Sequence, residues 1–156
     1  MMKSKPLLGL LGVSVACAAL VALWVLRPAM RAPAQPAITL QAEPGCDSAR
    51  QACRARGDDL EIELQLGPAL RPLEPFSIAL RGNPDTAARI EVQFLMRGMD
   101  MGLNRYRLDR DADGVWRGRA VLPVCTTGRS DWYAVIEIAQ GGRRWIAEMP
   151  FVVGAP

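Results

Sequence analysis

The chain has 156 residues, of which 50% are hydrophobic and 22% are charged, which is enough apolar material for one packed domain. It contains no histidine, which excludes Ser-His-Asp and Cys-His catalysis and metal sites that need an imidazole ligand. The formal net charge is +3, but both lysines lie near the N-terminus, and the 17 arginines are almost matched by 16 acidic residues. The arginines form no basic stripe, so we expect no nucleic-acid binding, and no residue pattern indicates an enzyme.

The first element is an apolar run over Leu7–Leu26, which contains no charged residue. As a helix it would be about 30 Å long, which matches the hydrocarbon core of a bilayer. Lys3 and Lys5 precede the run, which favours a cytoplasmic N-terminus. The sequence therefore predicts a single-pass inner-membrane protein in which residues 1–26 form a cytoplasmic tip and anchor and the rest is periplasmic.

Two processing signals compete with this anchor. Ala32-Pro33-Ala34 has the small-residue pattern of a signal-peptidase site, although it lies well beyond the apolar run. Cys17 lies inside the run, where we interpret it as a small buried residue of the helix rather than a lipid attachment site. Residues 27–58 are then predicted to form a Pro/Ala-rich linker followed by a cysteine-pair segment, in which Ser48–Arg56 alone has helical spacing.

From residue 59 onward the apolar residues alternate with polar ones, which is the period of half-buried strands. Turn signals such as Gly82-Asn83-Pro84 and Gly141-Gly142 separate the alternating segments. The expected strands cover residues 60–66, 76–80, 90–96, 106–108, 116–122, 132–138 and 145–153. Seven short strands in residues 59–153 predict an all-β, immunoglobulin-like antiparallel sandwich, with the tryptophans of the last three strands in its core.

The segment between the third and fourth of these strands is rich in methionine. Met96 continues the inward-facing positions of its strand, whereas Met99 and Met101 lie in a loop flanked by glycines. A pair of thioethers is a soft ligand set that selects Cu(I). The alternative, which the sequence leaves open, is that both side chains fold back as adaptable filler over the end of the domain.

Cys125 follows the fifth expected strand in the segment PVCTTG. Successive antiparallel strands reverse direction, so the loops after the third and fifth strands should leave the same end of the domain. Met99, Met101 and Cys125 are therefore the predicted ligands of a copper(I) site. One miscounted strand would move Cys125 to the opposite end.

Two further cysteines, Cys46 and Cys53, precede the first of these strands. Outside the cytoplasm such a close pair is expected to form a disulfide. A straight helix would hold the two Cα atoms about 10 Å apart, too far for the bond, so the segment must bend. A bridge from Cys125 to either of them is the alternative.

Two motifs resemble known sites by chance. Residues 109–114 read DRDADG, the start of a calcium loop, but the twelfth position is Ala120 and the segment joins strands, so we predict a hairpin turn. Arg56-Gly57-Asp58 is an RGD triplet, which is too short to be specific.

The cysteine pair, the segment MRGMDMGLNRYRL and the segment GVWRGRAVLPVCTTGRSDWYAVIEI resemble small membrane-anchored periplasmic proteins of proteobacteria. The methionine loop and the sandwich are also similar to FixH/YtkA-like domains. This resemblance covers about residues 46–153 and implies copper handling or assembly of haem–copper oxidases. It maps the methionine loop of the family to Met99 and Met101 and its LPxC cysteine to Cys125. Members often carry a histidine near the methionines, and its absence here argues against Cu(II) and leaves Cu(I) or no metal at all.

Together these observations predict a periplasmic, membrane-anchored accessory protein that handles copper(I) or assists oxidase assembly. Its expected partners are the membrane, through Leu7–Leu26, and copper-delivery or oxidase-assembly proteins. The alternative is a metal-free protein-interaction module of the cell envelope.

Overall fold

The computed structural model describes residues 17, 21–22, 36–86, 88–125 and 128–153. The chain divides into two compact units, Met1–Ala34 and Gln35–Pro156, and the strands that the structure describes lie in the second. The strands are β1 (Ile38–Ala42), β2 (Cys53–Gly57), β3 (Leu60–Leu66), β4 (Pro75–Gly82), β5 (Arg89–Leu95), β6 (Arg105–Arg110), β7 (Trp116–Val121), β8 (Asp131–Gln140) and β9 (Arg143–Val152).

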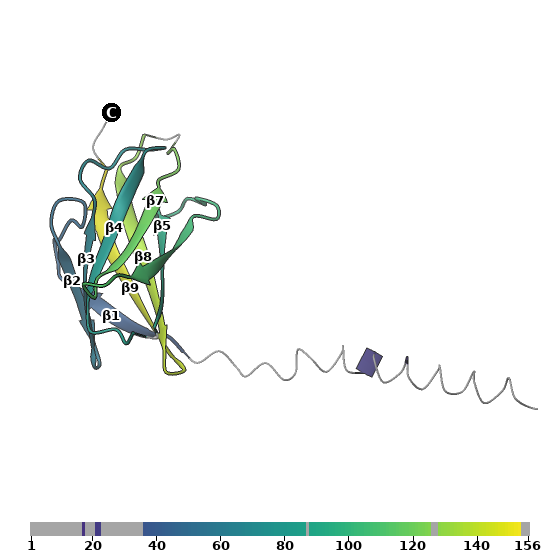
Figure 1. The fold of residues 1–156 in the computed structure, drawn as a ribbon. Coiled ribbons are helices and arrows are strands. Elements are labelled where there is room, and N and C mark those ends of the chain that lie inside the picture. The colour runs from purple at the N-terminus through teal and green to yellow at the C-terminus, as the bar shows by residue number, and fades with distance from the viewer. Residues whose placement is uncertain (1–16, 18–20, 23–35, 87, 126–127, 154–156) are drawn as a thin grey trace, which may run out of the picture. The chain divides into compact units, whose positions relative to one another are not determined.

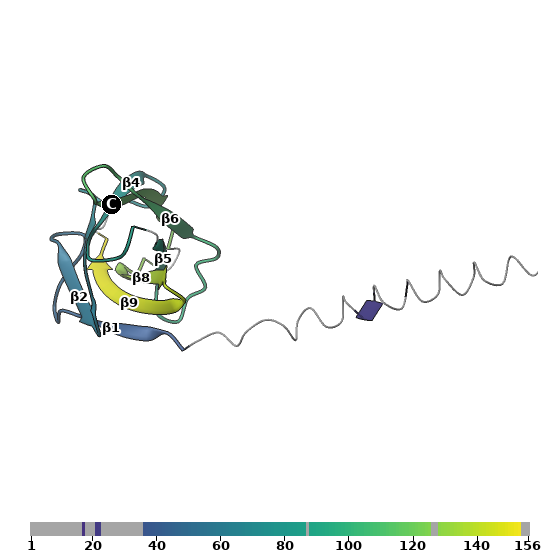
Figure 2. The ribbon, with the colours of Figure 1, turned by 60° about the horizontal axis from the view of Figure 1, so that its bottom comes forward.

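The strands form a closed barrel in the order β1-β2-β3-β4-β7-β6-β5-β8-β9, with β9 pairing back to β1 (Figures 1 and 2). Two strands close it by dividing their hydrogen bonds between neighbours. Residues 38–40 of β1 pair in parallel with β9, and residues 41–42 pair antiparallel with β2. Likewise, residues 105–108 of β6 pair with β5, and residues 109–110 pair with β7. Each of these strands therefore forms a corner between two sheets.

The core follows from the alternation of apolar and polar side chains. In β3 the leucines and Ile62 are buried while the residues between them face outward. The tryptophans expected in the core, Trp116, Trp132 and Trp145, are at most 4% exposed. Phe94 lies at the centre of an aromatic cluster and meets Phe151 edge to face, with ring centroids 5.8 Å apart. Seven alternating segments of the sequence thus correspond to β3–β9.

The predicted seven-stranded immunoglobulin-like sandwich is wrong, because the described chain forms a nine-stranded closed barrel. The two additional strands, β1 and β2, lie in the segment for which the sequence predicts a linker and a cysteine pair. Both have only five residues, and the buried positions of β2 are the small residues Cys53 and Ala55. Such positions give a weak hydrophobic alternation. The helical spacing of Ser48–Arg56 is likewise not realised: its first part is a turn and its last part is β2.

The predicted transmembrane segment, Leu7–Leu26, falls almost entirely outside the described residues, which include only Cys17, Val21 and Ala22 of it. Within the part of the chain that the structure describes, no helix is long and apolar enough to cross a membrane. The predicted anchor over Leu7–Leu26 stays a prediction.

The pairing of the strands defines two ends of the barrel. The first end, shown at the bottom of Figure 1, contains the start of β1 and the turn between β8 and β9. At the second end β5 and β7 finish, because each is antiparallel to β6 between them. The segment that joins β1 to β2 and the end of β9 also lie there. Within the described residues, the loops that contain cysteine or methionine lie at this second end, which we name the sulfur pole.

Candidate functional site

Two loops of the sulfur pole carry the residues predicted to bind copper. The Met loop, residues 96–104, joins β5 to β6, and the Cys loop, residues 122–130, joins β7 to β8. Met99, Met101 and Cys125 are all half-buried and all pack against the hydrophobic core. The structure therefore brings the three sulfur groups to one end of the barrel, each with part of its surface covered by the core.

The Met loop begins as a tight turn. The amide of Met99 donates to the carbonyl of Met96 (3.2 Å), and Gly98 between them has φ +74°, a conformation that glycine adopts without strain. Met96 itself is 1% exposed, as its inward-facing position predicts. The turn therefore folds Met99 back beside the end of β5 rather than extending it into solvent.

A buried asparagine anchors the second half of the Met loop. The Asn104 side-chain oxygen accepts from the amide of Phe94 (2.7 Å), and its Nδ2 donates to the carbonyl of Met101 (3.1 Å). Asn104 is 7% exposed, so these bonds form away from water, where they are costly to lose. Asn104 cannot be recognised from the sequence, because an asparagine before a strand resembles any turn residue.

Arg129 of the Cys loop reaches the Met loop. Its Nη1 donates to the carbonyl of Arg97 (3.0 Å), and its guanidinium forms a two-point ion pair with Asp131. The hydrogen bond and charge of Asp131 raise the pKa of Arg129, and the charge of a Cys125 thiolate contributes in the same direction. By the same pairing Arg129 lowers the pKa of Asp131. Arg129 thus ties the two loops together, and its charge, which Asp131 largely balances, also interacts with Cys125.

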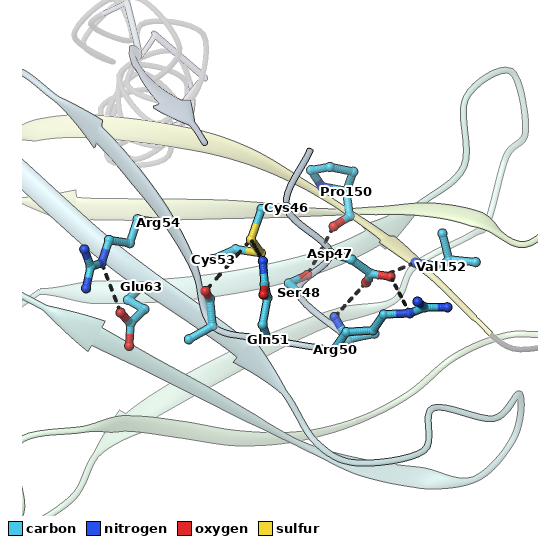
Figure 3. The surroundings of a disulfide bond; sticks show 12 residues. Cys46, Asp47, Ser48, Arg50, Gln51, Cys53, Arg54, Glu63, Pro150 and Val152 are labelled. Carbon is cyan, nitrogen blue, oxygen red and sulfur yellow. Dashed lines mark hydrogen bonds and ion pairs between the residues drawn. A yellow bond between two sulfur atoms is a disulfide. The ribbon is translucent and has the colours of Figure 1, made fainter. Parts of the chain in front are cut away.

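The disulfide between Cys46 and Cys53 closes the third loop of the sulfur pole, with Cα atoms 5.8 Å apart (Figure 3). The chain between them bends, since the amides of Arg50 and Gln51 both donate to the carbonyl of Asp47. Both cysteines are buried. The pairing favoured by the sequence is therefore the one present, and Cys125 lies outside it.

The residues between the two cysteines connect distant strands. The Ser48 amide and hydroxyl both donate to the carbonyl of Pro150 in β9, and the Ser48 carbonyl accepts from Leu66 of β3. The Asp47 carboxylate accepts from the amide of Val152 (3.3 Å; Figure 3). The pairing of β9 with β1 ends at Ala147, and Pro150 and Val152 follow it in the chain. The disulfide segment therefore supplies hydrogen bonds to this last part of β9, where β1 no longer does.

The two chance motifs have structural roles. Asp111 of the DRDADG segment accepts hydrogen bonds from the amides of Asp113 and Val115 and forms an ion pair with Arg117. Its oxygens are therefore engaged within a hairpin turn, as predicted. Asp58 of the RGD triplet lies in the β2–β3 turn and forms an ion pair with Arg143.

Among the described residues no group of three His, Cys, Asp or Glu side chains could hold a metal ion. Thioether sulfur is a further kind of metal ligand, and at the sulfur pole Met99 and Met101 could supply it beside the thiol of Cys125. Comparison with models of protein families, with curated proteins and with solved structures finds no match to this chain. The function of the pole must therefore be inferred from its own residues.

Proposed function

We propose that the protein is an extracytoplasmic accessory protein that handles copper(I) at its sulfur pole. The observation that carries this proposal is the position of the Met and Cys loops at one end of the barrel, tied together by the hydrogen bond from Arg129 to the carbonyl of Arg97. The donors are the thioethers of Met99 and Met101 and the thiol of Cys125. Soft sulfur ligands favour Cu(I), and the absence of histidine disfavours Cu(II).

Arg129 gives the proposed site an electrostatic advantage. A thiol binds a metal as the thiolate, and a nearby guanidinium stabilises that negative charge. The charge interaction with Cys125 is the smallest contribution to the raised pKa of Arg129, whose main partner is Asp131, so it supports the proposal only secondarily. The cysteine would be the only anionic donor, so a bound Cu(I) would be neutralised by one thiolate.

The proposed location rests on the disulfide. Structural disulfides persist in oxidising compartments and are rare in the reducing cytosol. The Cys46–Cys53 bridge therefore supports a domain that functions outside the cytoplasm. The resemblance of residues 46–153 to FixH/YtkA-like domains extends the proposal to a partner, namely a protein of copper delivery or haem–copper oxidase assembly.

A second candidate function is a metal-free interaction module. The observation that favours it is that Met99, Met101 and Cys125 all pack against the core, and that Asn104 and Arg129 order the two loops through the protein's own hydrogen bonds. In that case the methionines would act as packing residues, and the sulfur pole would contact a partner protein directly.

A competition titration separates these two functions. The full-length protein would be titrated with Cu(I) against a colorimetric Cu(I) chelator under anaerobic conditions, with ascorbate as the reductant because a thiol reductant would attack the disulfide. The copper proposal predicts one Cu(I) per chain and sulfur-only coordination in X-ray absorption. If the chelator retains all the copper, the interaction module replaces the copper proposal.

A further inference from the structure

A groove runs along the outer face of β3, β4 and β7 and ends at the disulfide segment, away from the Met and Cys loops. Its volume is about 640 Å³. Along β4 the inward residues Phe76, Ile78 and Leu80 are buried, so the intervening residues Ser77 and Ala79 face outward. These two small side chains form the floor, because larger residues lie on both neighbouring strands. In register with Ala79 are Gln65 of β3 and Arg117 of β7.

The end of the groove is rigidly built. Gly67 lies so close to β4 that a Cβ atom on it would come within 2.5 Å of the Ser77 hydroxyl oxygen. Its amide donates to the carbonyl of Ser77 (2.7 Å). Ala49 and Arg50, from the segment closed by the disulfide, form the adjacent wall, and Ser48 fixes that segment to Leu66. The groove is therefore formed before any ligand binds, which reduces the entropic cost of binding.

The charges along the groove have one sign. Arg50, Arg81 and Arg117 line it, and among the described lining residues there is no Asp or Glu. Arg50 and Arg117 form ion pairs with Asp47 and Asp111, which lie outside the lining.

Arg81 adds a charge that the barrel does not balance. It faces Glu63 across the β3–β4 ladder, but Glu63 forms its ion pair with Arg54. Within the described part of the chain, Arg81 makes no ion pair, and neither does Arg119, which lies opposite Ser77. The groove therefore presents a positive charge that a ligand can neutralise.

We propose that this groove binds an extended, acidic segment of a partner protein, lying along β4 with its carboxylates on Arg81 and on the Nη groups of Arg117, whose Nε is held by Asp111. Both hydrogen-bonding edges of β4 are already paired, one with β3 and the other with β7. Recognition would therefore use side chains rather than addition of a strand. Guanidinium groups bind carboxylates through two parallel hydrogen bonds, which gives both affinity and orientation. The Ser77 and Ala79 floor leaves room for the backbone of the segment. This inference is independent of copper binding.

Fluorescence anisotropy tests the proposal with the full-length protein and three labelled peptides of equal length, in which alanine alternates with Glu, Gln or Lys. The Glu peptide should bind with an affinity that falls as salt rises, and the Gln and Lys peptides should not bind. Arg81→Gln should weaken binding about tenfold, as expected for loss of one charged hydrogen-bonding partner. Ala79→Trp should fill the groove and abolish binding. Arg144→Gln, an exposed arginine on β9, is the matched control and should leave binding unchanged.

The proposal would be overturned by no binding of the Glu peptide, by equal binding of the Gln peptide, or by an equal loss of affinity in Arg144→Gln. If citrate displaces the peptide at matched carboxylate concentration, the groove is a site for small anions instead of a partner segment. Should Ala79→Trp lower the melting temperature strongly, Arg81→Gln decides the question, since its side chain lies on the outer face of the barrel.

Discussion

Ser48 and Pro150 lie 102 residues apart in the sequence, and both the amide and the hydroxyl of Ser48 donate to the carbonyl of Pro150, at 3.3 and 3.4 Å. Ser48 is fully buried. This contact lies beyond the part of β9 that pairs with β1. The Cys46–Cys53 disulfide holds the segment that contains Ser48 in the position that the contact requires. The cysteine pair therefore supports the contact between the disulfide segment and β9, which Ser48 and Asp47 make.

The first prediction concerns that disulfide. Cys46→Ser with Cys53→Ser should lower the free energy of unfolding by about 2–3 kcal/mol, because the bridge closes a short loop in the unfolded chain. Loss of order in the segment should also release the Ser48–Pro150 contact. Urea unfolding of both forms measures the difference. Ser48→Ala should cost only about 0.5–1.5 kcal/mol, because the amide bond to Pro150 remains. A double cysteine variant as stable as the native protein would contradict this role.

Tyr106 carries the second prediction. Its hydroxyl donates to the carbonyl of Val121 (2.7 Å) and accepts from the Val121 amide (3.3 Å), beyond the two residue pairs that join β6 to β7. Tyr106→Phe removes both bonds and should lower the free energy of unfolding by about 1–3 kcal/mol. Tyr133→Phe is the matched control, because Tyr133 contacts Arg97 through its ring face rather than through its hydroxyl. Equal stability losses in the two variants would show that the hydroxyl does not join the strands.

The third prediction concerns acid stability. Arg89, and secondarily Arg105, hold the pKa of Glu91 below its ordinary value of 4.5. Because the pKa of Glu91 is lower in the folded state, its stabilising effect is complete when the pH is above the pKa of the unfolded state. This effect is lost as the pH falls through the pKa of the folded state. The free energy of unfolding should therefore decrease below pH 4.5, and Glu91→Gln should make this decrease shallower. Glu43→Gln, an exposed carboxylate on the segment after β1, should leave the slope unchanged.

The sequence predicted β3–β9 because their buried side chains are large and alternate regularly. It could not reveal β1 as a partner of β9, because Leu40 and Ala147 are more than one hundred residues apart. Hydrophobic alternation in either segment predicts a strand but not the strand with which it pairs. The corner strands β1 and β6 convert the expected sandwich into a barrel. That outcome depends on where each strand changes neighbours, which hydrophobic periodicity does not specify.

The Met and Cys loops lie at the same end of the barrel, as predicted, although two strands were missed. Both missed strands precede β3, so the alternation of strand direction from β3 onward is unchanged. What the sequence could not identify were the residues that order the loops. Asn104 and Arg129 are recognisable only from their hydrogen bonds to the backbone of Phe94 and Arg97.

The last prediction tests the proposed copper ligands. Met99→Leu, Met101→Leu and Cys125→Ser should each weaken Cu(I) binding, with the largest loss for Cys125→Ser because the thiolate is the only anionic donor. Binding should weaken further as the pH falls, since protons compete with the metal for the sulfur. Met→Leu nearly conserves volume, so either methionine variant should change the free energy of unfolding by less than about 1.5 kcal/mol. Met149→Leu is the matched control: its side chain is 0% exposed in the core, and copper binding should be unaffected. Methionine variants that lose stability while Cu(I) affinity stays constant would instead identify the Met loop as a packing element.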